Sequence, residues 1–168
     1  MEVYAQHVGD RWIFYARERR LGQWQAVAEP PLEAGTATVA AEPTPLFRRL
    51  HETAEAAFDA VTGVIRHGTT MQQIIDAAGL IEDAGFTVFD DLMHGFGGGY
   101  FPPVLGSRSR PAGPLPEMTL KAGMTCVVQP NVITRDQKAG VQVGELVLVT
   151  ENGFARMHGV ERGLFRLG

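Results

Sequence analysis

The stretch DDLMHGFGGGYFPP, residues 90–103, places one histidine beside a glycine-rich run that ends in two prolines. The apolar segment 86–89, FTVF, precedes it and predicts a short strand. A stretch of this kind could form a phosphate cradle, a metal site or a close crossing of two backbone segments. The residues around it decide among these three.

The glycine spacing argues against a phosphate cradle. A dinucleotide fingerprint requires G-x-G-x-x-G between a strand and a helix, so that the helix N-terminus faces the pyrophosphate. Gly95 and Gly97 fit that pattern, but Tyr100 stands at the third glycine position, and Pro102-Pro103 disfavours an immediate helix. We therefore expect these glycines to permit positive φ angles and close backbone approach on a crowded strand.

The composition indicates a globular domain without a preference for polyanions. The chain has 168 residues, about one domain, and a net charge of −4, whereas nucleic acids and anionic membranes favour basic surfaces. Its one cysteine, Cys126, excludes an internal disulfide and is typical of a reducing compartment. No apolar stretch approaches the ~20 residues of a membrane helix. We expect a cytoplasmic protein without nucleic-acid or membrane partners.

Strands, then two helices, then strands again are predicted along the chain. Segments 3–8 and 12–17 alternate weakly and favour a hairpin with a turn at residues 9–10, and residues 28–45 form a linker or an irregular edge strand. Segments 124–130, MTCVVQP, and 145–150, ELVLVT, predict buried strands. This order indicates an α+β fold in a single domain, with a hairpin and linker at 1–36 and the main body at 37–168.

Capping signals locate the two helices. Thr44 can cap the first, with Pro45 at its first position, and its apolar residues recur at steps of three and four: Leu46, Leu50, Ala54, Ala57, Phe58, Val61 and Ile65. Thr70 and Gln73 have the spacing of a capping box at the start of the second helix. That helix is expected to end at Gly85 in the left-handed conformation.

Three motifs in order resemble the C-terminal half of the M24 peptidase family, which includes methionine aminopeptidases, Xaa-Pro aminopeptidases and creatinase. They are HGFGGGYFPP at 94–103, LKAGMTCVVQPNV at 120–132 and GVQVGELVLVTENG at 140–153. The two predicted helices match the family's helix pair, so the resemblance covers the chain from about residue 37. It implies a pita-bread fold, incomplete at the N-terminal side. Truncation, a completing chain or pairing of two copies as a homo-oligomer would each account for the missing half.

The resemblance also implies where metal ligands would lie. The family holds two divalent metals, such as Mn, Co or Zn, with two Asp, one His and two Glu. His94 matches the metal-binding His, but Phe101 stands at the position of a second, substrate-assisting His. Gln129 and Gly144 stand at the two Glu positions, and Glu145 is one residue beyond.

The two Asp positions fall on residues without carboxylates. Anchoring the family's hairpin glycine at Gly22 places them at Tyr15 and Ala26. One of five ligands therefore remains, and a lone imidazole does not hold a dinuclear site. The expectation is that the chain has no metal cofactor.

Two sets of residues are candidates for a ligand or substrate site. His94 could be a structural residue or a general base, with Glu145 as a second catalytic group, because histidine titrates near neutral pH. Gln129, Tyr100 and Phe101 could contact a substrate.

Arg108 and Arg110, in the long loop at 104–123, form the second set. Two arginines could hold a carboxylate in a bidentate manner, or they could lie at a solvated loop tip.

Three functions remain open from the sequence. The first is a non-catalytic or divergent M24 homologue, a pseudoenzyme that binds a peptide or small molecule in the cleft. The second is a metal-independent C–N hydrolase that resembles creatinase, with His94 as general base. The third is a truncated Xaa-Pro aminopeptidase-like metallopeptidase. Whether the chain is an enzyme is thus undecided by its sequence.

Overall fold

A computed structural model gives the architecture of the chain. It describes the backbone of residues 2–8, 11–17, 25–28, 38–39, 43–159, 162–163 and 165–166, and the side chains of 43–159 and 162–163. The chain forms two compact units, residues 1–38 and 39–168. Each unit is described by itself.

The first unit is a three-stranded antiparallel sheet in the order β1-β2-β3, with β1 at Glu2–Val8, β2 at Arg11–Arg17 and β3 at Gln25–Ala28. The pairing of β1 with β2 confirms the predicted hairpin, whose turn lies outside the described residues. Tyr15 pairs with Ala26 across β2 and β3. A linker is predicted at 28–45. The structure describes Ala28, residues 43–45 and strand β4 at Thr38–Val39 of this segment.

Helix α1 spans Pro45–Val64 and begins as its capping signal predicts. The Thr44 hydroxyl accepts a hydrogen bond from the Phe47 backbone N–H at 3.4 Å, which satisfies one of the free N–H groups at the helix start. The predicted apolar stripe supplies the buried face: Leu50, Ala54, Ala57, Phe58 and Val61 are all buried. Leu46, in the first turn, is exposed, because it lies ahead of the core.

The predicted second helix is two helices. Helix α2 spans Met71–Ala77 with the capping box of Thr70 and Gln73, and α3 spans Leu80–Asp83. The break lies at Gly79, where the Arg108 guanidinium donates to the Gly79 carbonyl at 2.7 Å. A Cβ at residue 79 would lie 2.7 Å from that guanidinium, so Arg108, 29 residues away in sequence, packs directly against the break. Gly85 has a φ of +87° and ends the segment as expected.

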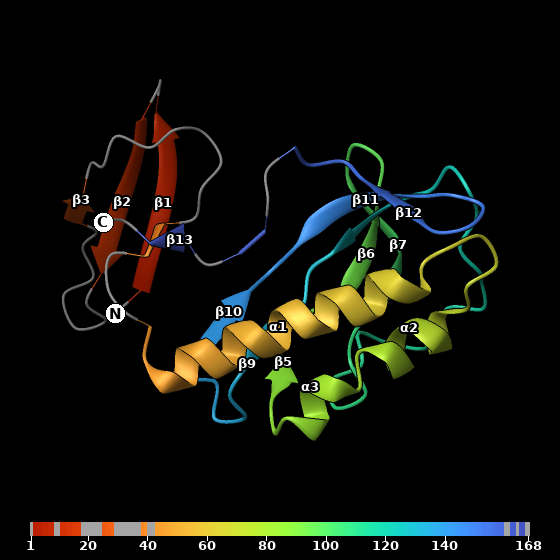
Figure 1. Cartoon of the computed structure of the whole chain (residues 1–168), viewed down its shortest axis with the longest axis horizontal. Helices are drawn as coiled ribbons and strands as arrows, with labels where there is room; N and C mark the ends of the chain where they lie inside the picture. The colour runs from red at the N-terminus through yellow and green to blue at the C-terminus, as the bar shows by residue number, and fades with distance from the viewer. Residues whose placement is uncertain are drawn as a thin grey trace. The chain divides into compact units, whose positions relative to one another are not determined.

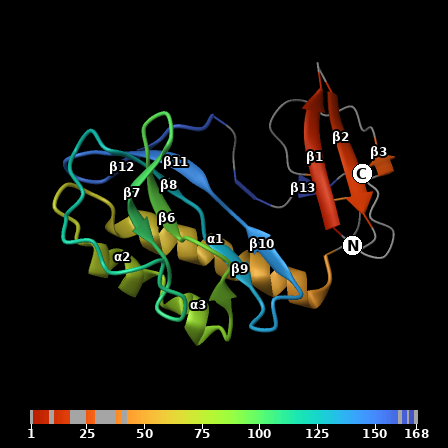
Figure 2. The same ribbon diagram turned by 180° about the vertical axis from the view of Figure 1, so that it is seen from behind.

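The second unit pairs these helices with short antiparallel sheets. A five-stranded sheet has the order β12-β11-β8-β6-β7, and a three-stranded sheet has the order β10-β9-β5. The strands are β5 Thr87–Val88, β6 Met93–Phe96, β7 Tyr100–Leu105, β8 Thr125–Val128, β9 Asn131–Ile133, β10 Gly140–Gln142, β11 Glu145–Val149, β12 Phe154–Arg156 and β13 Phe165–Arg166. Figures 1 and 2 show the helices on one side of strands β6, β8 and β11.

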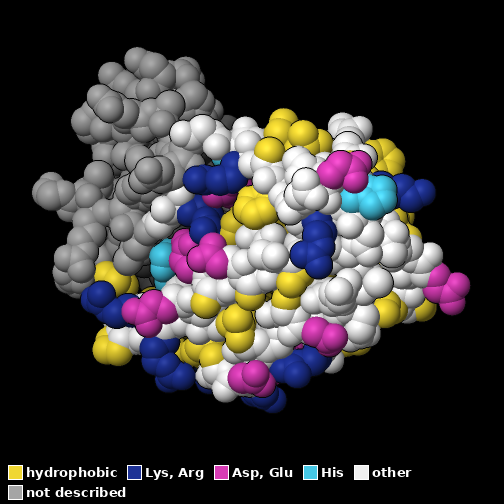
Figure 3. All heavy atoms as spheres, turned by 45° about the vertical axis from the view of Figure 1, so that its right-hand side comes forward, with side chains coloured by type: hydrophobic (Ala, Val, Ile, Leu, Met, Phe, Trp, Pro, Cys, Tyr) yellow, Lys and Arg dark blue, Asp and Glu magenta, His cyan; other side chains and the backbone are white. Residues whose placement is uncertain are grey.

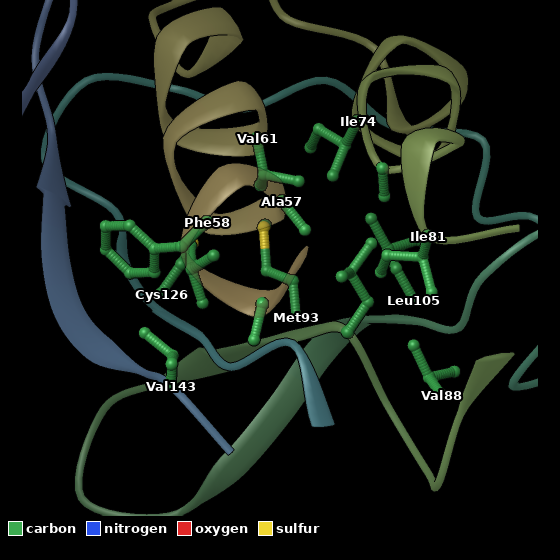
Figure 4. Close-up of a cluster of buried hydrophobic side chains, with 14 of the residues drawn as sticks. Ala57, Phe58, Val61, Ile74, Ile81, Val88, Met93, Leu105, Cys126 and Val143 are labelled. Carbon is green, nitrogen blue, oxygen red and sulfur yellow. The ribbon is translucent and has the colours of Figure 1, made fainter. Parts of the chain in front are cut away.

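The core of this unit lies between the helices and the strands. Figure 4 shows Phe58 and Val61 of α1 facing Met93, Cys126 and Val143. These side chains are at most 8 % exposed. Burial of each large apolar side chain contributes about 1.5–3 kcal/mol, so this layer holds helix and sheet together.

The surface of the second unit carries charges of both signs. On the face drawn in Figure 3, acidic and basic side chains alternate with apolar ones over the described residues. Within the described part of the chain, no helix is both long enough and apolar enough to cross a membrane.

The glycine run permits a close crossing of β6 and β7. A Cβ on Gly95 would lie 2.4 Å from the Pro102 carbonyl oxygen, far inside van der Waals contact, and the pairing register shifts between His94 and Gly95. Gly98 has a φ of +86° in the tip of the hairpin. Close approach and positive φ, the two properties expected of these glycines, both occur here.

We expect Gly95→Ala to lower the free energy of unfolding by about 1–3 kcal/mol, because its methyl group would force the backbones of β6 and β7 apart. The matched variant is Gly97→Ala, whose Cβ would meet only the Phe101 ring at 3.8 Å. Urea unfolding of both variants measures the difference. Equal stability of the two would contradict the crossing as the reason for glycine at position 95.

Candidate functional site

The five-stranded sheet has an open face that carries His94. Residues directly opposite in antiparallel strands share a face, and side chains alternate between faces along each strand. His94 pairs with Val127, and Val127 pairs with Leu146. Val127 and Leu146 are partly exposed, so this row, which we call the open face, borders solvent.

The neighbouring row faces the helices and contains Glu145. Met93 pairs with Val128, and Val128 pairs with Glu145. Met93 and Val128 are fully buried beneath the helices, and the Glu145 side chain is 2 % exposed. His94 and Glu145, the two residues predicted to be catalytic, therefore point to opposite faces of the sheet, and the structure does not bring them together.

Two arginines bind the Glu145 carboxylate. Arg156 donates from Nε and Nη2 to its two oxygens, each at 2.7 Å, in the bidentate geometry of strong arginine–carboxylate pairs. The Nε of Arg162 lies 3.4 Å from Oε1. Arg162 also packs over the Phe58 ring at 3.8 Å and pairs with Asp59 of α1 at 2.7 Å. Glu145 thus joins β11, β12 and α1.

His94 is held in one orientation on the open face. The imidazole is 7 % exposed, and its Nδ1 lies 2.9 Å from the Gly95 carbonyl oxygen. A carbonyl can only accept, so Nδ1 carries the proton and Nε2 keeps its lone pair in the neutral ring. Tyr100 stacks on the imidazole with ring centroids 4.2 Å apart and an interplanar angle of 28°.

A chain of polar contacts runs from Tyr100 across the sheet. Burial raises the pKa of the Tyr100 phenol, and the charge of Asp91 and a hydrogen bond to that carboxylate raise it further. Asp91 is buried and accepts from Gln129 Nε2 at 3.1 Å. Gln129 Oε1 in turn accepts from Gln142 Nε2 at 3.3 Å. We call Asp91, Gln129 and Gln142 the amide relay.

A pocket of about 460 Å³ opens next to this relay. Its apolar wall is Phe96, Val127 and Leu146, and Gln129 and Gln142 are its amide groups. The remaining lining residues are Gly144, Glu145 and His158. The volume is that of a small-molecule site. Gly144 also fits closely here, because a Cβ on it would lie 3.0 Å from Gln129 Cβ.

The other predicted contact residues lie outside this pocket's lining. Phe101 is 51 % exposed and lines a second pocket of about 260 Å³ at the β6–β7 hairpin. Arg108 bonds the α3 region, with Asp83 at 3.1 Å as well as the Gly79 carbonyl. Arg110 lies near the Val88 carbonyl, at 3.4 Å. The structure therefore separates the two arginines from Gln129 and His94.

Sequence reasoning did not identify Asp91 and Gln142 as site residues. Asp91 lies two residues before β6, and a carboxylate near a strand in a glycine-rich segment is a weak signal for a buried partner. Gln142 lies two residues before Gly144, so the alternation of a strand could have placed both on one face. Among the described residues, no three His, Cys, Asp or Glu side chains group closely enough to hold a metal ion.

We expect Glu145→Ala to destabilise the second unit by about 2–3 kcal/mol, because it removes the bidentate acceptor of Arg156 and the most buried of the carboxylates that contact Arg162. Glu151→Ala is the control, since that side chain is 73 % exposed and its ion pair to His67 is 3.8 Å long. Thermal or urea unfolding measures both. An unchanged stability of Glu145→Ala would show that the arginine contacts are not structural.

The Tyr100 phenol should ionise above the ordinary value near pH 10. The folded state holds this proton more tightly than the unfolded chain. Its contribution to stability is therefore complete below pH ~10 and is lost as the pH rises through the raised pKa of Tyr100. The difference in phenolate absorbance between the natural chain and Tyr100→Phe gives the midpoint. A midpoint at or below 10 would contradict the contact with Asp91.

Comparisons with known proteins agree with this fold. The family model described as metallopeptidase family M24 matches residues 34–151. An X-Pro aminopeptidase from Thermotoga maritima has a TM-score of 0.66 at 17% identity, over 94% of this chain and 42% of that one. A prolidase from Pyrococcus furiosus has a TM-score of 0.61 at 20% identity, over 95% and 41%. A methionine aminopeptidase from Rickettsia prowazekii has a TM-score of 0.56 at 20% identity, over 92% and 61%.

The chain spans about two fifths of the first two of these structures. A search of curated proteins gives no match. The structural likeness shows the fold, an incomplete M24 pita-bread domain of mixed helix and sheet, and the matched residues cover more than half of the sequence. The chain belongs to metallopeptidase family M24.

Proposed function

We propose that this chain is a divergent M24 member that binds a short peptide or small molecule in the open-face pocket without the family's two-metal centre. The single observation that carries the proposal is the row His94, Val127 and Leu146, whose two apolar members line the pocket and whose imidazole lies beside Val127. The acid nearest in sequence to the expected ligand position, Glu145, is bound by arginines on the opposite face. We accordingly propose that the chain uses no cofactor.

Three positions where the family resemblance implies metal ligands support a metal-free site. Gln129 is neutral, and its amide is already bonded to Asp91 and Gln142. Gly144 has no side chain, and a Cβ there would be crowded at 3.0 Å by Gln129. His94 uses Nδ1 toward the Gly95 carbonyl. These residues do not fit a pair of divalent metals, which require several anionic oxygens.

The chemistry of the pocket suits an uncharged ligand segment. Phe96, Val127 and Leu146 offer apolar contact, and the two glutamines offer hydrogen bonds without net charge. A charged group of a ligand would lose hydration against the apolar wall and would find no side chain of opposite charge in that wall. A peptide backbone with an apolar side chain has both of the required properties.

A second function, metal-independent hydrolysis of a C–N bond, is favoured by the orientation of His94. With Nδ1 hydrogen-bonded to a carbonyl, Nε2 is the nitrogen that could accept a proton as a general base. Glu145 points to the opposite face of the sheet, so it does not lie beside His94 as a second catalytic group. Loss of turnover in His94→Gln, with binding kept, would distinguish this function from binding alone.

Binding calorimetry with a panel of di- and tripeptides, with and without blocked N-termini, tests the proposal. At least one peptide should bind with the same Kd with and without a metal chelator and should be recovered intact. Leu146→Lys should weaken that binding by about tenfold or more, because a charge would enter the apolar wall.

The matched control is Leu148→Lys. Leu148 is on the same face of β11 and is similarly partly exposed, but it does not line the pocket. It should leave the Kd unchanged. Hydrolysis that the chelator stops, absence of binding across the panel, or equal effects of the two lysines would each contradict the proposal. A cytoplasmic location, and assembly with a second copy or a completing chain, remain predictions from the sequence.

A further inference from the structure

The amide relay has a fixed direction. A side-chain amide has an acceptor oxygen and a donor nitrogen, and either end could in principle face a given neighbour. An ionised carboxylate can only accept, so Gln129 must turn its NH₂ group to Asp91, at 3.1 Å. Its oxygen is then directed to Gln142, which must donate, at 3.3 Å.

The direction set by Asp91 reaches the pocket. Gln142 uses one of its two N–H donors toward Gln129, so its NH₂ end is turned to the relay and its carbonyl oxygen is the acceptor that it offers to a ligand. Gln142 is exposed and lines the pocket, whereas Asp91 is buried and does not line it. The buried Asp91 carboxylate therefore orients Gln129, and Gln129 orients Gln142. As a result, Gln142 presents a hydrogen-bond acceptor to the pocket.

The Tyr100 phenol lies beside this constraint. Burial and the charge of Asp91 raise the pKa of the phenol, and the same ring stacks on His94. The Gln129 amide donates to Asp91, which opposes its reversal. Reversal of Gln129 would bring its oxygen against a buried carboxylate, which leaves an unsatisfied charge in a poorly solvated position.

We propose that the amide relay makes the pocket selective for ligands that donate an N–H to Gln142, such as amides, over isosteric esters that cannot. This inference rests on the proposed function, since it names the ligand class of the same pocket. Asp91 is a positioning residue in this account, and Gln142 contacts the ligand. The apolar wall of Phe96, Val127 and Leu146 takes the hydrocarbon part of the ligand.

The discrimination has a simple physical origin. An amide N–H forms a hydrogen bond to Gln142 Oε1. An ester oxygen at the same place sets two acceptors against each other, and both lose their contact with water. Sites that hydrogen-bond a ligand N–H reject analogues without it much more strongly than apolar pockets reject a missing methylene. The partly open pocket reduces this effect, so at least about a tenfold preference is expected.

The test uses a pair of probes with a single difference, N-methylhexanamide and methyl hexanoate, titrated into the full chain and followed by NMR chemical shifts. The amide should bind at least about tenfold more tightly than the ester. Asp91→Asn should bring the ratio of the two dissociation constants close to one, because the new side-chain amide can donate or accept and no longer fixes the direction of Gln129. Gln142→Met should do the same by removing the acceptor.

The control variants come from a matched pair outside the pocket. Gln72 donates to Asp76 at 2.8 Å on helix α2, so Asp76→Asn and Gln72→Met make the same chemical changes elsewhere. Both should leave the ratio unchanged. Gln142 is exposed, so Gln142→Met keeps the test decisive if Asp91→Asn does not fold.

The outcomes separate this inference from the proposed function. Equal affinity of the natural chain for amide and ester would overturn the inference and leave metal-free binding intact. A preference that persists in both Asp91→Asn and Gln142→Met would also overturn it. If neither probe binds, the inference fails, and the peptide panel with its chelator control decides the proposed function independently.

Discussion

The pairing register of β6, β8 and β11 is the constraint on which the rest of the second unit depends. The helices cover one face of these strands (Figures 1 and 2), so every second residue must be apolar or neutralised, and a shift by one residue would expose the whole row. Met93 and Val128 meet this requirement by packing under the helices. The same register places His94 on the opposite face, in one row with Val127 and Leu146, which line the pocket.

Glu145 is the exception in the buried row. Removing a carboxylate from water costs several kcal/mol unless it is paired and hydrogen-bonded. Arg156 supplies a bidentate pair from the neighbouring strand, and Arg162 approaches from the segment that follows β12. Arg162 also contacts Phe58 and Asp59 of α1. Through these two arginines, the buried Glu145 carboxylate connects the sheet, helix α1 and the segment that follows β12.

Local signals in the sequence were sufficient to predict where helices begin and end, but not to predict which side chains meet at the site. The caps at Thr44 and Thr70 and the left-handed Gly85 depend on residues within one helical turn, so their sequence spacing predicts them. The contact of Arg108 with the Gly79 carbonyl at the helix break could not be predicted, because the two residues lie 29 positions apart. Asp91 bonds Gln129 across 38 residues, and no local pattern reports such a contact.

The side of the sheet that Glu145 faces illustrates the same limit. Its sequence position beside Gly144 left both faces open, since a strand alternates and a single residue of slip reverses it. The pairing with Val128 settles the direction of the side chain. The M24 motifs predicted the fold because they describe backbone crossings, such as that at Gly95, whereas the chemistry depends on individual side chains.

The central claim is that the open face of this M24 member does not hold the family's two metals. The most direct measurement is the metal content of the purified chain after incubation with Mn²⁺, Co²⁺ or Zn²⁺ and removal of free ions, counted by elemental mass spectrometry. The account predicts no ion retained in stoichiometric amount. One or two ions per chain, lost together with peptidase turnover in His94→Ala, would contradict it.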